Sequence, residues 1–229
     1  ARKSRGLGDV YKRQVLTFLV AIFLVSSQIQ AWAADKDYVL NTASTGGTYH
    51  PVGTAIATLT KVKLLPKQKF SLTAVNSAGS GANVQALGAK TADFAILQGL
   101  YGSYAATGTG PISEPQKNLR SVTMLWQNVE QFLVANEKVK SGTVSDLRGL
   151  KGQAAGMGTQ NSGTLGSNKV LLSGLGLDIS GDFDLVYAGY GPTADALANG
   201  QIVAAGIPSG PPTGAVSYTH LRAHETYVH

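Results

Sequence analysis

The stretch from Asp37 to Val62, DYVLNTASTGGTYHPVGTAIATLTKV, constrains the fold of this chain more than any other. Its residues 38–43 form a run of β-branched and apolar residues of strand length. Residues 44–49 are rich in glycine and hydroxyl groups, as in a turn. From Pro51 onward apolar residues recur at near-helical spacing, and proline suits a first helical turn. Strand, turn and helix in this order predict one βα unit and indicate an α/β fold.

The glycine turn of this unit is a candidate ligand site. Gly46 and Gly47 lack a Cβ atom, so they can take a positive φ and let a ligand approach the backbone. The first N–H groups of the next helix have no internal partners, and the helix dipole places partial positive charge there. A carboxylate or phosphate is therefore the expected guest, with hydroxyl donors from Thr45, Thr48 and Tyr49. The residues alone fit a plain tight turn with an N-capped helix equally well.

Two further turns of the same kind follow strand-like segments, at residues 76–83 and 158–164. Gln98 ends the apolar run 94–97, so its amide could reach a ligand, although a polar residue at a strand end is often only a surface residue. In open α/β sheets, ligands bind at the carboxyl ends of the strands. We therefore expect these ligand-binding residues: Thr45, Gly46, Gly47, Thr48, Tyr49, Asn76, Ser77, Gly79, Ser80, Gln98, Gln160, Ser162, Gly163, Thr164 and Tyr190.

The two ends of the chain look foreign to the rest. Residues 1–14 and 217–229 resemble translated adapter sequence, and we exclude them from the reasoning on the fold. The formal net charge of +6 comes largely from these ends, so basicity gives little support for nucleic-acid binding and we expect no nucleic-acid partner. Cysteine is absent, which excludes disulfides and cysteine-ligated metals. We expect no metal and no cofactor.

Residues 15–27 are free of charge and apolar, and they lie next to the segment Ala31-Trp32-Ala33. A run of 13 residues is short for a membrane span, which needs about 20. The A-x-A pattern indicates cleavage before Ala34. We therefore expect a secretory signal peptide over 15–33 and a periplasmic protein. An uncleaved amino-terminal anchor is the alternative.

The common catalytic motifs are missing from this sequence. It has no G-x-x-x-x-G-K-[ST] phosphate loop, no H-E-x-x-H metal motif and no G-x-S-x-G nucleophile elbow. His50 is the one histidine outside the foreign-looking tail. Neutral donors at helix starts need no base or nucleophile, which suits reversible binding better than catalysis. We therefore expect no enzymatic activity and no catalytic residue.

Several of these segments resemble one family. Thr45–Tyr49 with Pro51 and Gly53 resembles the opening of TAXI-type solute-binding proteins, which serve tripartite ATP-independent periplasmic (TRAP) transporters. His50 stands where a second aromatic residue is common in that family. Residues 89–98, AKTADFAILQ, resemble its G-x-A-D-hydrophobic-Q segment, and Ser162–Thr164 resembles its S-G-T turn. The resemblance covers about residues 37–216.

The resemblance implies a two-lobed periplasmic-binding-protein fold, type II-like, with a ligand cleft between the lobes and its C-terminal part missing. Lobe I would span 34–128, lobe II 129–206, and the return to lobe I would start at 207–216. The ligand would be a small anion, namely a carboxylate such as an amino acid or dicarboxylate. The receptor would be a monomer that delivers it to the membrane subunits of a TRAP transporter. The alternatives are an exported α/β hydrolase using His50, and a sensor or antigen that serves no transporter.

The remaining elements are predicted from local pattern. We expect strands at 70–75, 119–126, 131–135, 153–157, 184–187 and 202–205, and helices at 51–64, 165–175 and 194–199. Pro66 should break the first helix, and residues 101–115 should be mostly loop. A short helix within 144–152 should be capped by Ser145 or Asp146 and ended by Gly149. The chain should cross between lobes near 127–130.

Overall fold

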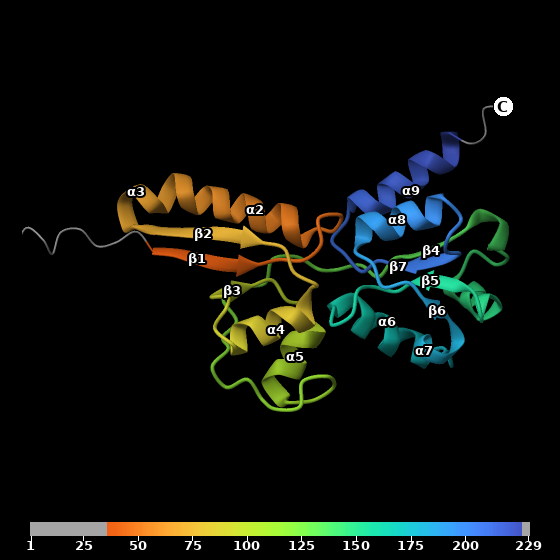
Figure 1. The fold of residues 1–229 in the computed structure, drawn as a ribbon, viewed down its shortest axis with the longest axis horizontal. Helices are drawn as coiled ribbons and strands as arrows, with labels where there is room; N and C mark the ends of the chain where they lie inside the picture. The colour runs from red at the N-terminus through yellow and green to blue at the C-terminus, as the bar shows by residue number, and fades with distance from the viewer. Residues whose placement is uncertain (1–35, 226–229) are drawn as a thin grey trace, which may run out of the picture.

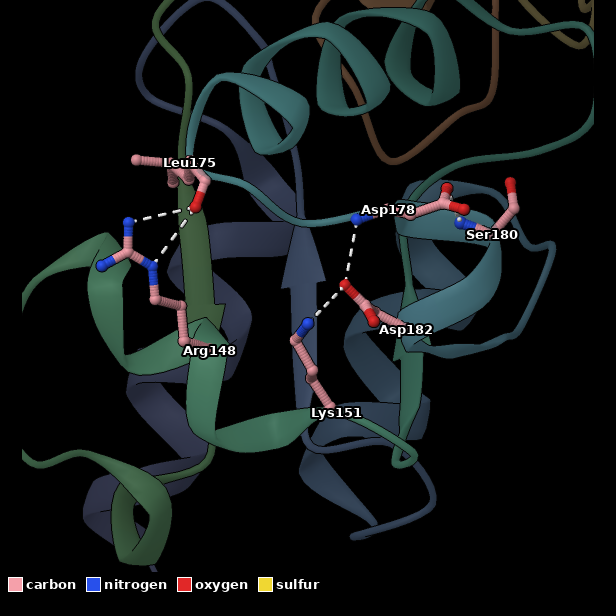
Figure 2. Close-up of polar contacts among 6 residues, drawn as sticks. All are labelled: Arg148, Lys151, Leu175, Asp178, Ser180 and Asp182. Atoms are coloured by element: carbon pink, nitrogen blue, oxygen red, sulfur yellow. Dashed lines mark hydrogen bonds and ion pairs between the residues drawn. The ribbon is translucent and has the colours of Figure 1, made fainter.

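Two β-sheets organise residues 36–225, the part of the chain that the computed structural model describes (Figure 1). The first sheet has the order β2-β1-β3, and its strands β1 (Lys36–Asn41), β2 (Phe70–Val75) and β3 (Phe94–Ala95) are all parallel. The second sheet has the order β4-β7-β5-β6. In it β4 (Phe132–Val134) runs antiparallel to β7 (Ala204–Gly206), while β5 (Ala154–Gly156) and β6 (Asp184–Leu185) run parallel.

Helices cover both faces of the first sheet (Figure 1). On one face α2 (Tyr49–Leu59) continues into a π-helical segment, η1 (Thr60–Leu64), and then into α3 (Leu65–Gln68). On the other face lie α4 (Ser80–Gly88) and α5 (Gly99–Thr107). The apolar residues of the predicted βα unit face each other here, because Leu40 of β1, Leu72 of β2 and Ala57 of α2 pack with Ile96 in one buried cluster.

The second sheet is also sandwiched between helices (Figure 1). On one side lie α6 (Gly163–Gly174) and α7 (Ile179–Asp182), and on the other α8 (Tyr190–Ala198) and α9 (Gly214–Glu225). Two short 3₁₀ segments, η2 (Asn136–Lys138) and η3 (Val144–Leu150), follow β4. One cluster of buried residues includes side chains of α6 and α7, and the other includes side chains of α8 and α9. The largest fully buried side chains of these clusters are Leu147, Met157, Leu172, Leu177, Ile179, Ile202 and Ile207.

The chain passes between the two sheets twice, and the two passages pair with each other. Val129 and Ser209 form an antiparallel bridge, with N–H to oxygen distances of 2.9 and 3.0 Å in the two directions. The expected α/β architecture of two lobes is therefore confirmed. The lobe boundaries at residues 128/129 and 206/207 remain our proposal.

Most predicted elements are present, and β2 has the predicted bounds. Pro66 does not end the helical run, because it lies in the first turn of α3, where its missing N–H has no helical partner to lose. The prediction of loop over residues 101–115 is wrong for its first half, where α5 forms. The cap of η3 is Thr143, whose side chain accepts from the N–H of Ser145, and the element extends past Gly149 to Leu150.

The predicted strand at 119–126 is absent. The segment alternates as a strand should, but a strand also needs a hydrogen-bonded neighbour, and none of the described strands lies beside it. Val122 and Met124 are consequently 80% and 88% exposed. Trp126, at the end of the segment, packs on Tyr49 with ring centroids 5.6 Å apart.

The expected foreign segment at 1–14 and the expected signal peptide at 15–33 lie outside the described residues. At the other end, α9 runs into the segment that we predicted to be foreign. None of the helices within residues 36–225 is both long and apolar enough to cross a membrane.

Candidate functional site

A cavity of about 40 Å³ lies where the two lobes meet. One water molecule needs about 10–15 Å³ of such space, so a small polyatomic group would fill this cavity. None of the lining residues is charged. They are Ala43, Ser44, Gly47, Thr48, Tyr49, Ala78, Gly79, Ser80, Gln98, Asn128, Thr159, Ser162, Gly163, Thr164, Ala188, Gly189, Tyr190, Pro208 and Ser209.

Five helices begin at this cavity, and the residue that precedes the first turn of each lines it. At four of these helix starts the side chain of the preceding residue accepts no hydrogen bond from a helix N–H. At the fifth, that of α6, Ser162 Oγ accepts from the N–H of Leu165 at 3.0 Å. The helices are α2, α4, α5, α6 and α8, preceded by Thr48, Gly79, Gln98, Ser162 and Gly189.

The lobes contact each other on one side of the cavity through the loop before α6. Thr159 Oγ1 donates to the carbonyl of Ala78 at 2.9 Å. The N–H of Ala82 donates to the carbonyl of Asn161 at 3.0 Å. Asn161 Nδ2 donates to Gln85 Oε1 at 2.7 Å. We call these three hydrogen bonds the Asn161 latch.

Contacts also join the first glycine turn to the second lobe and to the returning chain. The N–H of Tyr190 donates to Ser44 Oγ at 3.4 Å, and Thr48 Oγ1 donates to the carbonyl of Gly210 at 2.7 Å. The N–H of Ala215 donates to the carbonyl of Gly46 at 3.4 Å. The cavity is therefore bounded by direct contacts on two sides.

The glycines of the first turn serve close packing rather than a left-handed backbone. Neither Gly46 nor Gly47 has a positive φ, so that expectation is wrong. A Cβ atom on Gly46 would lie 2.5 Å from the backbone nitrogen of Gly191, and one on Gly47 would lie 2.9 Å from the ring of Tyr190. Absence of a side chain therefore allows the second lobe to approach.

The hydroxyl of Tyr190 is fixed at the cavity wall. It donates to the carbonyl of Pro208 at 2.6 Å and lies 2.6 Å from Thr164 Oγ1. Burial raises its pKa strongly. Burial also raises the pKa of Tyr49, against the opposing effect of hydrogen bonds to Ser80 and Asn128. Both tyrosines therefore remain neutral at physiological pH.

Glu130 is the acid that acts electrostatically on this site. Its charge contributes to raising the pKa of both Tyr49 and Tyr190. Partial burial of its carboxyl group raises the pKa of Glu130 itself. The acid is therefore near enough to influence the cavity without lining it.

The structure brings ten of the predicted ligand-binding residues to one cavity. They come from all three glycine turns, from Gln98 and from the start of α8, and they are Gly47, Thr48, Tyr49, Gly79, Ser80, Gln98, Ser162, Gly163, Thr164 and Tyr190. The other five do not line it: Thr45, Gly46, Asn76, Ser77 and Gln160. Ser77 is a turn residue, since its Oγ donates to the carbonyl of Thr42 and accepts from the N–H of Gly79.

Nine lining residues were missed by the sequence reasoning. Ser44 and Thr159 lie within or beside the recognised turns and could have been included. Asn128, Pro208 and Ser209 belong to the two passages between lobes, where no local motif marks a binding residue. The others are Ala43, Ala78, Ala188 and Gly189.

His50 does not line the cavity. Its Nδ1 atom lies 3.3 Å from the hydroxyl of Thr42, a fully buried residue. Within residues 36–225, no group of three or more histidine, cysteine or acidic side chains is placed to hold a metal ion.

Solved structures share this fold. A protein of Bordetella bronchiseptica RB50 matches with a TM-score of 0.60 at 19% identity, over 82% of this chain and 54% of that one. The methylphosphonate complex of PhnD1 from Prochlorococcus marinus (MIT 9301) matches with a TM-score of 0.55 at 17% identity, over 84% of this chain and 69% of that one. A binding protein component of an ABC phosphonate transporter from Pseudomonas aeruginosa matches with a TM-score of 0.54 at 14% identity, over 83% of this chain and 62% of that one.

These likenesses establish a fold, the two-lobed α/β fold of periplasmic binding proteins. The chain spans little more than half the length of the first structures that it matches. The model of the NMT1-like family matches residues 40–228, which include the second sheet, the whole cavity lining and the first sheet except the start of β1. The chain therefore belongs to the NMT1-like family.

Proposed function

We propose that this protein is an extracytoplasmic solute-binding receptor that holds a small anionic ligand in the cavity between its lobes. One observation carries the proposal: five helix starts from two lobes meet at a cavity whose lining residues are all uncharged. The backbone N–H groups of the first helical turns and the positive ends of the helix dipoles stabilise a negative charge there.

The same geometry favours binding over catalysis. The neutral hydroxyl, amide and backbone groups of the lining can donate hydrogen bonds to an oxyanion. The tyrosine hydroxyls of the site have raised pKa values, so they would be weak general acids in a catalysed reaction. His50, the residue on which a hydrolase would depend, points to Thr42 rather than into the cavity.

The ligand class that we propose is a small carboxylate, an amino acid or a dicarboxylate, as the TAXI resemblance implies. Phosphonates and sulfonates offer the same kind of oxyanion to helix N-termini, and one structural relative is a complex with methylphosphonate. All of these ligands share a compact anionic head.

We further propose that the receptor acts as a monomer in the periplasm, after export through the segment 15–33, and delivers its ligand to the membrane subunits of a transporter. The TAXI resemblance favours a TRAP transporter. A structural relative described as a component of an ABC phosphonate transporter makes the ABC class the alternative. A gene for an ATPase subunit next to this one would favour the ABC class, and its absence with membrane-subunit genes present would favour TRAP.

A thermal-shift screen of the purified chain tests the ligand class. The panel contains glutamate, succinate, acetate, methylphosphonate and methanesulfonate, with succinamide as a neutral control. At a concentration about 100 times the Kd, a ligand stabilises by about 2.7 kcal/mol, which raises Tm by roughly 5–10 °C in a chain of this size. If no anion moves the melting curve, anion capture is wrong.

Anion affinity is expected to fall as pH rises through the raised pKa of Glu130. Below that pKa its carboxyl group is neutral, and above it the carboxylate repels the ligand. The effect should be a few-fold, since intervening solvent screens it. Calorimetry with the best ligand of the panel at several pH values measures the profile. Glu130→Gln should flatten it, and an unchanged profile in that variant would exclude Glu130 as the cause.

A further inference from the structure

Figure 1 shows α3 and the start of β1 at the end of the first lobe that lies farthest from the second sheet. The segments at this end contain a group of lysines. It is built from the start of β1, from η1 and from α3. The backbone N–H of Lys36 donates to the carbonyl of Lys69 at 2.8 Å, so the start of β1 lies beside the residue that follows α3. We call it the lysine tip, and its basic residues are Lys36, Lys61, Lys63, Lys67 and Lys69.

Acidic residues are scarce around the lysine tip. Residues 38–92 contain no aspartate or glutamate. Asp35 and Asp37 flank Lys36 in the sequence. The carboxylate of Asp37 accepts from Ser71 Oγ at 2.6 Å and Thr73 Oγ1 at 2.8 Å, which lowers its pKa. Two acidic residues therefore accompany five lysines in the segments that form this end of the lobe.

Exposed apolar side chains lie among these lysines. Leu59 is 59% exposed and Val62 is 61% exposed. Thr60 between them is turned inward, where its hydroxyl donates to the carbonyl of Ala57 at 2.8 Å and accepts from the N–H of Leu72 at 3.0 Å. This anchoring of Thr60 to β2 leaves Lys61, Val62 and Lys63 facing solvent.

The chain enters the described structure at this same end. β1 begins at Lys36, and the apolar segment 15–27 precedes it by eight residues. Eight residues span less than about 30 Å even when fully extended. A chain still attached to its amino-terminal segment in a membrane would therefore hold the lysine tip close to the lipid surface.

Charge is also distributed unevenly between the two lobes. Residues 34–128 contain eight basic and four acidic residues, whereas residues 129–206 contain five basic and seven acidic ones. An anionic surface would attract the first lobe and repel the second, so it would orient the molecule as well as bind it.

From these observations we propose that the lysine tip docks on anionic lipid headgroups at the membrane surface, with Leu59 and Val62 at the headgroup level. Lysines bound to an anionic leaflet each strengthen association by about fivefold (about 1 kcal/mol), and adjacent apolar residues add to it. In the docked orientation the first lobe contacts the membrane and the second lobe points away from it. This proposal is independent of which solute the cavity holds.

The test uses the full chain, which has no cysteine, so one cysteine can carry an environment-sensitive fluorophore. Val62→Cys places the probe in the lysine tip, and Val170→Cys, at a residue 49% exposed on α6, is the matched control. Both are titrated with vesicles of phosphatidylcholine alone and of phosphatidylcholine with phosphatidylglycerol. Each probe is also combined with K61Q/K63Q/K67Q or with the equal charge change K138Q/K140Q/K169Q in the second lobe.

The probe at residue 62 should report an apolar environment only with the anionic vesicles, and added salt should reverse the change. In K61Q/K63Q/K67Q the lipid concentration for half-response should rise about a hundredfold, while K138Q/K140Q/K169Q should leave it nearly unchanged. Binding through residues 15–27 alone predicts instead an equal response in both triple variants. That result, or no response at residue 62, overturns the proposal.

Discussion

Replacing Gly81 with alanine is expected to weaken ligand binding about ten- to a hundredfold while both lobes stay folded. Gly81 does not line the cavity. A Cβ atom there would lie 2.5 Å from the carbonyl oxygen of Asn161, across the lobe contact, and would also collide with the Asn161 side chain. Overpacking of this kind costs about 1–3 kcal/mol, and the lobes can avoid it only by moving apart, which opens the Asn161 latch.

Gly102→Ala is the matched control, because Gly102 also lies within a helix of the first lobe and a Cβ there has no neighbour within 4 Å. Alanine favours a helix interior over glycine by about 1 kcal/mol, which offsets part of the overpacking cost at position 81, so both variants should stay folded. Calorimetry with the best ligand of the panel compares their Kd values. Equal affinity in the two variants would mean that closure of the latch does not contribute to binding.

Replacing Asn83 with leucine is expected to lower the free energy of unfolding by roughly 1–3 kcal/mol. Asn83 is fully buried, and its Nδ2 donates to the carbonyls of Thr42 at 2.8 Å and Ile96 at 2.9 Å. These carbonyls follow β1 and β3, so one amide ties two strand ends together. Leucine has a similar volume but cannot donate. It leaves the buried carbonyl of Ile96 unpaired, which costs about 1–3 kcal/mol, while the carbonyl of Thr42 keeps its hydrogen bond from Ser77 Oγ.

Asn199→Leu, at an exposed asparagine after α8, is the control and should stay within about 0.5 kcal/mol of the parent. Urea unfolding monitored by tryptophan fluorescence and by circular dichroism measures both variants. The second lobe uses the same device, since Nδ2 of the buried Asn168 donates to the carbonyls of Met157 and Gly206. An Asn83→Leu protein as stable as the parent would show that the strand ends are held by other contacts.

Sequence patterns predicted the parts of this fold that depend on local chemistry. The run 70–75 alternates and is bounded by a lysine and an asparagine turn, so β2 could be placed to the residue. The glycine and hydroxyl turns could be recognised because they stand between a strand-like run and a helix-like run. Parallel strands end at one edge of a sheet, which is why the three turns could be expected near a common site.

Features that depend on distant neighbours could not be predicted in this way. The segment 119–126 has a strand pattern, but its pairing depends on a partner elsewhere in space. Asn128 and Ser209 reach the cavity because the two passages between lobes run beside each other, and their sequences do not reveal this. Gly46 was predicted to bind the ligand, but it does not line the cavity. Its missing side chain makes room for the backbone of Gly191, which lies 145 residues further along the chain.

The pairing of Val129 with Ser209 has a mechanical consequence. A single connecting strand would let the two halves of the molecule swivel, shear and fold with little preference among these movements. Two antiparallel strands joined by hydrogen bonds form a ribbon, which bends easily across its flat face but resists sliding of one strand along the other. Movement between the halves is thereby biased towards bending about the paired segments.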